Sequence, residues 1–183
     1  MFDFEGTATG ESAQVNVSNG GLGLTVTALD SGVVDISLAA GFTPGFGTRA
    51  AIGRSGSTCP TFCGLRYEFS QDVNAVEFLY GDSGGDLDIV TIQAFAANNT
   101  LLGTFTDDIG GSSVAESGLV SFAGARYFIL TSTESNFANP NSVFSEVANV
   151  TVAPITGSVP EPATLALVGL AIAGAVASSR KRA

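Results

Sequence analysis

The 183-residue sequence contains no histidine and no tryptophan. A serine nucleophile needs a base to accept its proton, and without histidine the chain cannot form a Ser-His-Asp site. A structural zinc ion needs four ligands, and the chain offers two cysteines and no histidine. Sugar-binding proteins usually stack a tryptophan or tyrosine on the sugar ring, and this chain has only three tyrosines. The missing residues therefore argue against hydrolase, zinc and lectin functions.

Positive charge is also scarce, with seven lysine and arginine residues against 17 acidic ones. Residues 1–159 contain 16 acidic and four basic residues, which gives this part a net charge of −12. The only lysine is Lys181, near the C-terminus. An acidic surface repels phosphate groups, so the composition excludes nucleic acid as a partner.

Ser83 lies in the stretch GDSGG (81–85), which matches the sequence around the nucleophile of chymotrypsin-like proteases and the G-x-S-x-G elbow of α/β-hydrolases. Both mechanisms need a histidine, and no helical pattern follows the stretch as the elbow requires. We therefore interpret this serine as part of a turn.

Short segments with alternating apolar residues recur between residues 2 and 153, and no segment has a helical period. LGLTVTAL (22–29) places Leu22, Leu24 and Val26 on one face, and NAVEFLYG (74–81) does the same for alternate residues. GLVSF (118–122) and RYFILTS (126–132) follow as further short segments, and AANNT (96–100) has the composition of a hairpin turn. The pattern predicts an all-β fold, an antiparallel β-sandwich of the jelly-roll type, over residues 1–153.

The C-terminal stretch, residues 159–183, differs from everything before it. Residues 163–179 carry no charge, and as a helix they would span about 25 Å, slightly less than the hydrocarbon core of a bilayer. Two prolines just upstream prevent the helix from starting earlier, and three basic residues follow it (Pro160, Pro162; Arg180, Lys181, Arg182). We expect a linker at 154–159 and one hydrophobic helix at 163–179 that places the preceding domain outside the cell.

The order Pro160-Glu161-Pro162, apolar run, Arg-Lys-Arg resembles the PEP-CTERM sorting signal of Gram-negative bacteria that make exopolysaccharide. The resemblance covers residues 159–183. It implies recognition by exosortase, an integral-membrane protease, with Pro160, Glu161 and Pro162 as the recognition element. It further implies an exported protein, anchored in the inner membrane before processing and later found in the envelope or outside the cell. Since no leader precedes FDFEG, we expect the natural start to lie upstream of Met1.

Cys59 and Cys63 occur in the stretch STCPTFCG (57–64). In an exported chain we expect them to form a local disulfide, which would hold a long irregular segment at 42–64. Such a bridge closes a short loop and contributes little to stability.

The turn sequence GDSGGDLD (81–88) brings Asp82, Asp86 and Asp88 close together in the chain. Calcium takes six to eight oxygen ligands, and the glycines would allow the loop to curl around an ion. The spacing is not that of an EF-hand. These carboxylates are therefore one candidate calcium site.

The body of the chain also resembles PEP-CTERM ectodomains and carbohydrate-binding jelly rolls, in the stretches FDFEGTATG (2–10), YGDSGGDLDIVTIQAFAANNTLLG (80–103) and ANVTV (148–152). Jelly rolls of this kind commonly hold a structural calcium near their first and last strands. The resemblance thus suggests a second site, in which Asp3 or Glu5 meets Asn149. The alternative for all these acids is that they are solvated and prevent aggregation at strand edges.

We expect a non-catalytic, exported protein of the envelope or extracellular matrix that is sorted through its C-terminal signal. One alternative is a calcium-dependent carbohydrate-binding module that acts on exopolysaccharide. A third hypothesis is a polysaccharide-active enzyme that uses two carboxylates, although no pair is marked out by the sequence.

Overall fold

The computed structural model describes residue 2 and residues 4–38, 49–54, 64–81, 88–109, 115–134 and 144–152. The chain divides into two units, Met1–Ala153 and Pro154–Ala183, and every described residue belongs to the first. The predicted helix at 163–179 lies outside the described residues.

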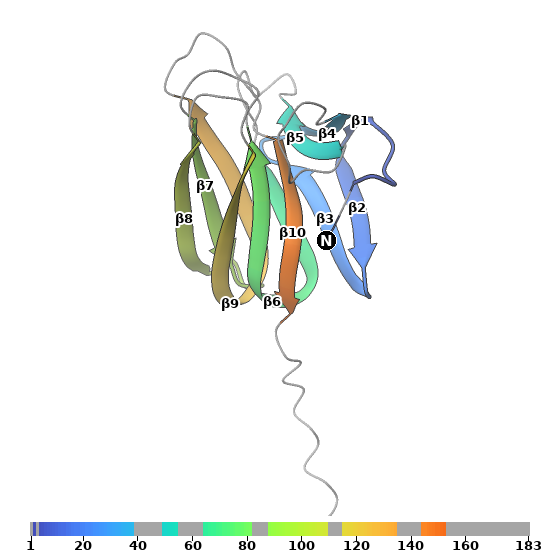
Figure 1. The fold of residues 1–183 in the computed structure, drawn as a ribbon. Coiled ribbons are helices and arrows are strands. Elements are labelled where there is room, and N and C mark those ends of the chain that lie inside the picture. Colours follow the sequence, from blue (N-terminus) through green and yellow to red (C-terminus); the bar gives the residue numbers. More distant parts are fainter. Residues whose placement is uncertain are drawn as a thin grey trace, which may run out of the picture. The chain divides into compact units, whose positions relative to one another are not determined.

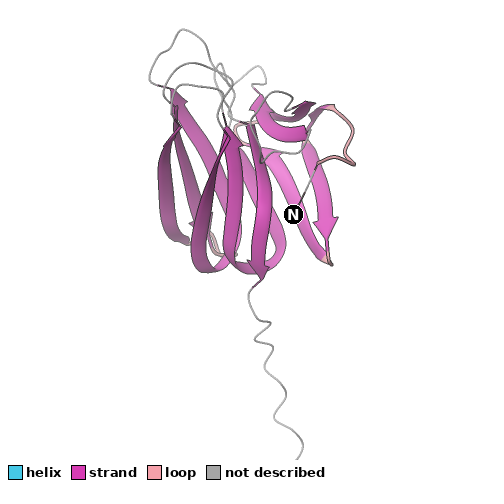
Figure 2. Ribbon diagram, in the orientation of Figure 1, coloured by secondary structure: helices cyan, strands magenta, loops and turns pink. Residues whose placement is uncertain are grey.

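Ten strands make up the regular structure of the described chain, and all of their pairings are antiparallel (Figures 1 and 2). Alternating polar and apolar residues produce them, because successive side chains of a strand point to opposite faces. The predicted all-β, antiparallel class is confirmed. The strands are β1 (Gly10–Ser12), β2 (Gln14–Asn19), β3 (Leu22–Ala28), β4 (Val33–Leu38), β5 (Arg49–Arg54), β6 (Leu65–Gly81), β7 (Asp88–Phe95), β8 (Leu101–Ile109), β9 (Ala115–Glu134) and β10 (Phe144–Val152).

Two long strands, β6 and β9, pair with each other along most of their length and pass through a shared bend. Residues 65–69 of β6 pair with β3, whereas residues 73–81 pair with β10. The β6–β9 pairing shifts register around Val73, opposite Ala125, and Gly124 next to it has φ = +77°. Glycine adopts this left-handed conformation without steric cost, which explains why the strand can bend there.

The bend divides the sheet into two layers. The first runs in the order β2-β3-β6-β9-β7-β8, with the N-terminal half of β6 and the C-terminal half of β9. The second runs in the order β1-β4-β5-β10-β6-β9, with the other halves of the two long strands. Figure 1 shows β9, β6 and β10 lying next to one another.

Aromatic side chains join the two layers in the core. Phe78, in the second layer, lies edge-to-face against Tyr67 and Phe128 of the first, with ring centroids 5.3 and 5.5 Å apart. The Tyr67 hydroxyl is also 2.5 Å from the Ser145 hydroxyl of β10, so this buried polar pair is satisfied across the layers. All these side chains are fully buried, which places the centre of the core between β6, β9 and β10.

The start of the described domain lies against the last strand in the second layer. The Phe2 N–H donates to the Val147 carbonyl of β10 at 3.0 Å, and Phe2 is buried. The segment that follows is held by Arg49, which donates from its backbone to the Glu5 carboxylate and from its guanidinium to the Glu5 and Thr7 carbonyls. The N-terminal segment is thus part of the folded domain.

Candidate functional site

The described part of the chain carries three polar features, and the first is a seam along one open side of the two layers. We use the name seam for the contact between β8 and residues 115–125 of β9. Phe105 of β8 packs where a Cβ on Gly118 would lie, 2.8 Å from that position, and Phe122 packs in the same way on Gly103 at 2.1 Å. A side chain in place of either glycine would occupy this space, so the ring would have to move aside.

Next to these rings, three titratable groups from three strands meet at the seam. The Tyr80 hydroxyl of β6 donates to the Asp107 carboxylate of β8 at 2.5 Å, and Glu116 of β9 pairs with Tyr80 in the strand register. Chemically, the cluster is a phenol and two carboxyl groups that come from three strands.

Burial and a neighbouring carboxylate raise the pKa values of Tyr80 and Glu116. The pKa of Glu116 rises above its ordinary value because of burial first, and then because of the charge of Asp107 and the hydrogen bond to it. The pKa of Tyr80 rises because the ring is buried, because its hydroxyl donates to Asp107, and because both carboxylates oppose a phenolate. The phenol therefore stays protonated as a hydrogen-bond donor.

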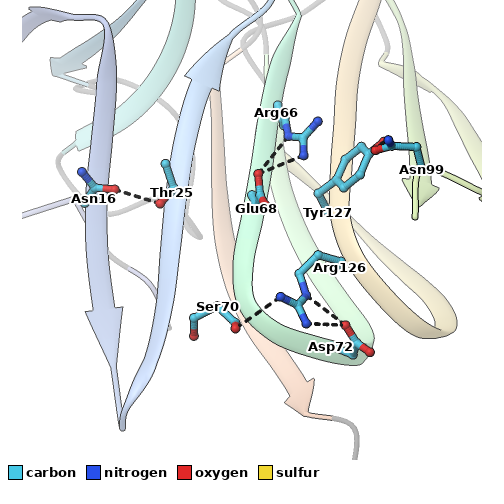
Figure 3. A network of polar contacts seen from close by, with 9 residues as sticks. All are labelled: Asn16, Thr25, Arg66, Glu68, Ser70, Asp72, Asn99, Arg126 and Tyr127. Carbon is cyan, nitrogen blue, oxygen red and sulfur yellow. Dashed lines mark hydrogen bonds and ion pairs between the residues drawn. The ribbon is translucent and has the colours of Figure 1, made fainter. Parts of the chain in front are cut away.

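The second feature is a polar network on the outer face of the first layer (Figure 3). The Arg66 guanidinium lies 3.6 Å from the centre of the Tyr127 ring, a cation–π geometry, and also bonds to the Glu68 carboxylate at 2.9 Å. Phe95 stacks on the same tyrosine with ring centroids 4.9 Å apart, and the tyrosine hydroxyl donates to Asn99. Tyr127 is only 5% exposed as a result, so its ring is covered and cannot stack on a ligand.

The same view shows how polar pairs hold the bend of the long strands. Arg126 of β9 bonds to Asp72 of β6 at 2.9 Å and to the Ser70 carbonyl at 3.4 Å. On the neighbouring strands Thr25 donates to Asn16 at 2.8 Å. Because both partners of the Arg126 ion pair are partly exposed, we assign it a positional role and little stability.

The third feature is an open groove of about 270 Å³ along residues 7–16. Its walls are the chain before β1 and the start of β2, and Glu11 is its one ionisable residue among the lining side chains. Among the described residues that line the groove, no second titratable group lies beside that carboxylate.

Most of the predicted calcium ligands and both cysteines lie outside the described side chains. This holds for Asp3, Asp82, Asp86, Cys59 and Cys63, and for Asp88 the structure describes the backbone, in β7, but not the side chain.

The two remaining candidates, Glu5 and Asn149, each contact a different group. The Glu5 carboxylate accepts from the Arg49 backbone N–H at 3.0 Å, and the Asn149 amide donates to the Glu77 carboxylate at 2.5 Å. Within the described ranges, no three His, Cys, Asp or Glu side chains lie close enough together to hold a metal ion. The structure thus leaves both proposed calcium sites as predictions.

Among the residues that the structure describes, we find no helix of sufficient length and hydrophobicity to cross a membrane.

Comparison with known families concerns the C-terminal stretch. The family described as PEP-CTERM protein-sorting motif matches residues 158–182. The chain carries a PEP-CTERM sorting motif. The predicted resemblance is therefore confirmed, and Pro160, Glu161, Pro162 and the basic residues Arg180, Lys181 and Arg182 all fall within the matched segment. Proteins with this motif are exported and associate with the membrane or envelope through exosortase, and this chain is accordingly an exported, exosortase-sorted protein.

One solved structure resembles the described domain weakly. The enzymatically active domain of tailspike protein 4 from bacteriophage CBA120 superposes with a TM-score of 0.38 and 8% sequence identity, over 69% of this chain. The chain spans only 19% of the length of that tailspike chain. A likeness this weak carries no argument about function. No curated protein matches the sequence.

The cluster of Tyr80, Asp107 and Glu116 was not identified from the sequence of the PEP-CTERM chain. Its members come from three strands, and the two carboxylates are separated by the connection between β8 and β9. The sequence of β8 held one local signal of the position of Asp107. Phe105 and Asp107 alternate with exposed residues, so they share the inward face of β8 with the buried Ile109.

Proposed function

We propose that this protein is a non-catalytic component of the cell envelope or extracellular polysaccharide matrix, delivered there by exosortase processing of its C-terminal motif. Its domain would be a jelly-roll-like β-sandwich that remains after the motif is removed. The observation that carries the proposal is the sorting motif at 158–182, which follows the last described strand by only five residues.

The described carboxylates favour a role without catalysis. Retaining glycosidases hold their two carboxyl groups about 5 Å apart and inverting ones hold them further apart, which leaves room for the sugar or a water molecule. The two oxygens of Asp107 instead accept hydrogen bonds from the buried Tyr80 hydroxyl at 2.5 Å and from the Asp108 backbone N–H at 3.1 Å. Tyr80 is fully buried and stays protonated, so it serves neither as a base nor as a nucleophile.

The described aromatic residues place the carbohydrate-binding alternative second. All three tyrosines of the chain are buried, with Tyr67 and Tyr80 fully enclosed and Tyr127 covered by Arg66 and Phe95. None of them presents a ring face to a sugar. Binding to polysaccharide would have to depend on other groups.

The proposal is tested by expressing the full chain behind an export leader in a bacterium with an exosortase and following its size and location. We expect the wild-type chain to lose its C-terminal segment and to leave the inner membrane. Glu161→Ala should remain at full length in the membrane fraction, because the recognition element is incomplete. Asp108→Asn, an exposed acid on β8, is the matched control and should be processed normally.

Processing of Glu161→Ala at the wild-type rate would contradict the sorting role of this residue. Polysaccharide cleavage by the purified protein that disappears in Glu116→Gln would contradict the non-catalytic role, whatever the result for sorting.

A further inference from the structure

The chain leaves the described domain at an end where several turns and bends gather. β10 ends at Val152, which pairs with Val73 in the bend of β6, and Val73 pairs with Ala125 of β9. The β2–β3 turn lies at the same end of the strands (Figure 1). The turn between β7 and β8 joins it, because Asn99 accepts a hydrogen bond from Tyr127 of β9. We call this the tether end and define it by residues 19–22, 70–74, 96–101, 123–126 and Val152.

The tether end carries no net charge, although the domain is strongly acidic. Of the residues that define it, only Asp72 and Arg126 are ionisable, and they form an ion pair at 2.9 Å. Acidic residues lie farther along the strands. Asp107 and Asp108 are close to the far end of β8, and Glu116 lies at the start of β9, about 25 Å from the bend. An anionic lipid surface therefore repels the far end of the domain more than the tether end.

Exposed apolar side chains also gather at the tether end. Three large hydrophobic residues are exposed in the described domain, and two of them, Leu101 at 48% and Val152 at 38%, belong to this end. The third, Leu119, lies on the outside of the β6–β9 pair. A single exposed apolar residue is common on a protein surface. Here two of them coincide with an end that lacks net charge and from which the chain continues to its sorting motif.

The connection to the sorting motif is short. The matched motif begins at residue 158, and the extended chain between Val152 and that residue reaches at most about 22 Å. A strand rises about 3.4 Å per residue, so the other end of β10 lies about 27 Å farther away. Proteins with this motif associate with the membrane or envelope through exosortase. While the motif is attached, the tether end is therefore the part of the domain that can meet the bilayer.

We propose that the tether end rests on the lipid surface of the inner membrane until the motif is removed, with Leu101 and Val152 entering the headgroup region. Attachment raises the local concentration of the domain at the surface, so weak contacts suffice. Two side chains bury too little apolar surface to hold a detached domain, so removal of the motif would free it. This inference rests on the proposed delivery through the motif, but its test requires no processing.

Tryptophan fluorescence tests the contact without background, because the chain contains no tryptophan. The full chain with Leu101→Trp is purified in detergent and reconstituted into vesicles of phosphatidylethanolamine and phosphatidylglycerol that also contain a lipid with a spin-labelled headgroup, which quenches on contact. The matched control is Leu119→Trp, which replaces the other exposed leucine. We expect quenching and a shift to shorter wavelength for Leu101→Trp, and neither effect for Leu119→Trp.

The role of charge is tested by a second substitution in the Leu101→Trp chain. Ala97→Asp adds a negative charge at an exposed position of the same turn, and Thr106→Asp adds one farther along β8. One charge at an anionic surface changes such an equilibrium about fivefold, so Ala97→Asp should lower the ratio of contacting to free domains by about that factor. Thr106→Asp should leave the quenching unchanged, as should Ala97→Asp in phosphatidylcholine vesicles. Equal quenching with and without Ala97→Asp in the anionic vesicles would contradict the role of charge.

Equal quenching of the two reporters, or none in either, would overturn the proposal, and so would a chain that does not float with the vesicles. A wavelength shift without quenching that appears only after an exosortase is added would also overturn it, and would assign the tether end to that enzyme. If Leu101→Trp fails to fold, Ala97→Trp in the same turn replaces it and is read in the same way. Since the basic assay contains no exosortase, normal processing of Glu161→Ala would refute the sorting role and leave this result unaffected.

Discussion

The aromatic contact between the layers should make Phe78 one of the most sensitive positions of the domain. Phe78 is fully buried and meets Tyr67 and Phe128 edge-to-face at interplanar angles of 74° and 64°. Each such pair contributes about 0.5–1.5 kcal/mol beyond the burial of its area. Phe78→Leu loses both pairs and leaves part of the ring volume empty, so we expect the free energy of unfolding to fall by about 2–4 kcal/mol.

This loss is large compared with the about 5–15 kcal/mol that keeps an ordinary domain folded. It is measured by urea unfolding of the full chain in detergent, followed by far-UV circular dichroism. The urea midpoint should decrease at an unchanged slope, because a conservative core substitution alters stability and leaves the surface exposed on unfolding nearly the same. In a domain of this size the melting temperature should decrease by about 5–15 °C.

The matched control for Phe78 is a leucine on the outside of the same strand pair. Leu119 of β9 is 66% exposed and pairs with Glu77 of β6. Leu119→Ala should change stability by no more than about 0.5 kcal/mol, since exposed positions seldom contribute more. If Phe78→Leu is no more destabilising than Leu119→Ala, the two layers are not held together through this aromatic cluster, and the reasoning is refuted.

Two further substitutions can be measured by the same assay. Gly64→Ala should lower the free energy of unfolding by about 1–3 kcal/mol, because the added Cβ would lie 2.8 Å from the Leu130 carbonyl oxygen and the backbone cannot easily move aside. Gly6→Ala is the control and should be close to neutral, because nothing lies within 4 Å of its Cβ position. Equal effects of the two substitutions would contradict this account. Tyr67→Phe should cost about 1–3 kcal/mol by leaving the buried Ser145 hydroxyl without this partner. Adding Ser145→Ala to it should restore part of the loss, whereas simple additivity of the two changes would count against the bond.

Alternation along single strands was readable from the sequence because it is a local property. Leu22, Leu24 and Val26 were predicted to share one face of a strand, and all three are buried. The AANNT turn was also predicted correctly, and Asn99 adopts the expected left-handed conformation with φ = +66°. The Thr100 N–H donates to the Asn98 side chain, which explains why asparagine suits this turn.

The long strands could not be read in the same way. GLVSF (118–122) and RYFILTS (126–132) were expected as separate short segments, and Gly124 lies between them. The structure joins both segments in β9, in which Gly124 bends the strand and Arg126 bonds to Asp72 of β6. Whether such a stretch becomes a turn or a bend depends on the strand beside it, and that partner is distant in sequence.

The sorting motif and the seam differ in how far apart their determinants lie. Exosortase recognition depends on the order of residues in one continuous segment, so Pro160, Glu161 and Pro162 could be identified without a structure. The seam depends on which glycine faces which ring, and the strand registers decide that. Strand registers bring together residues that are distant in sequence, so no continuous segment could reveal them.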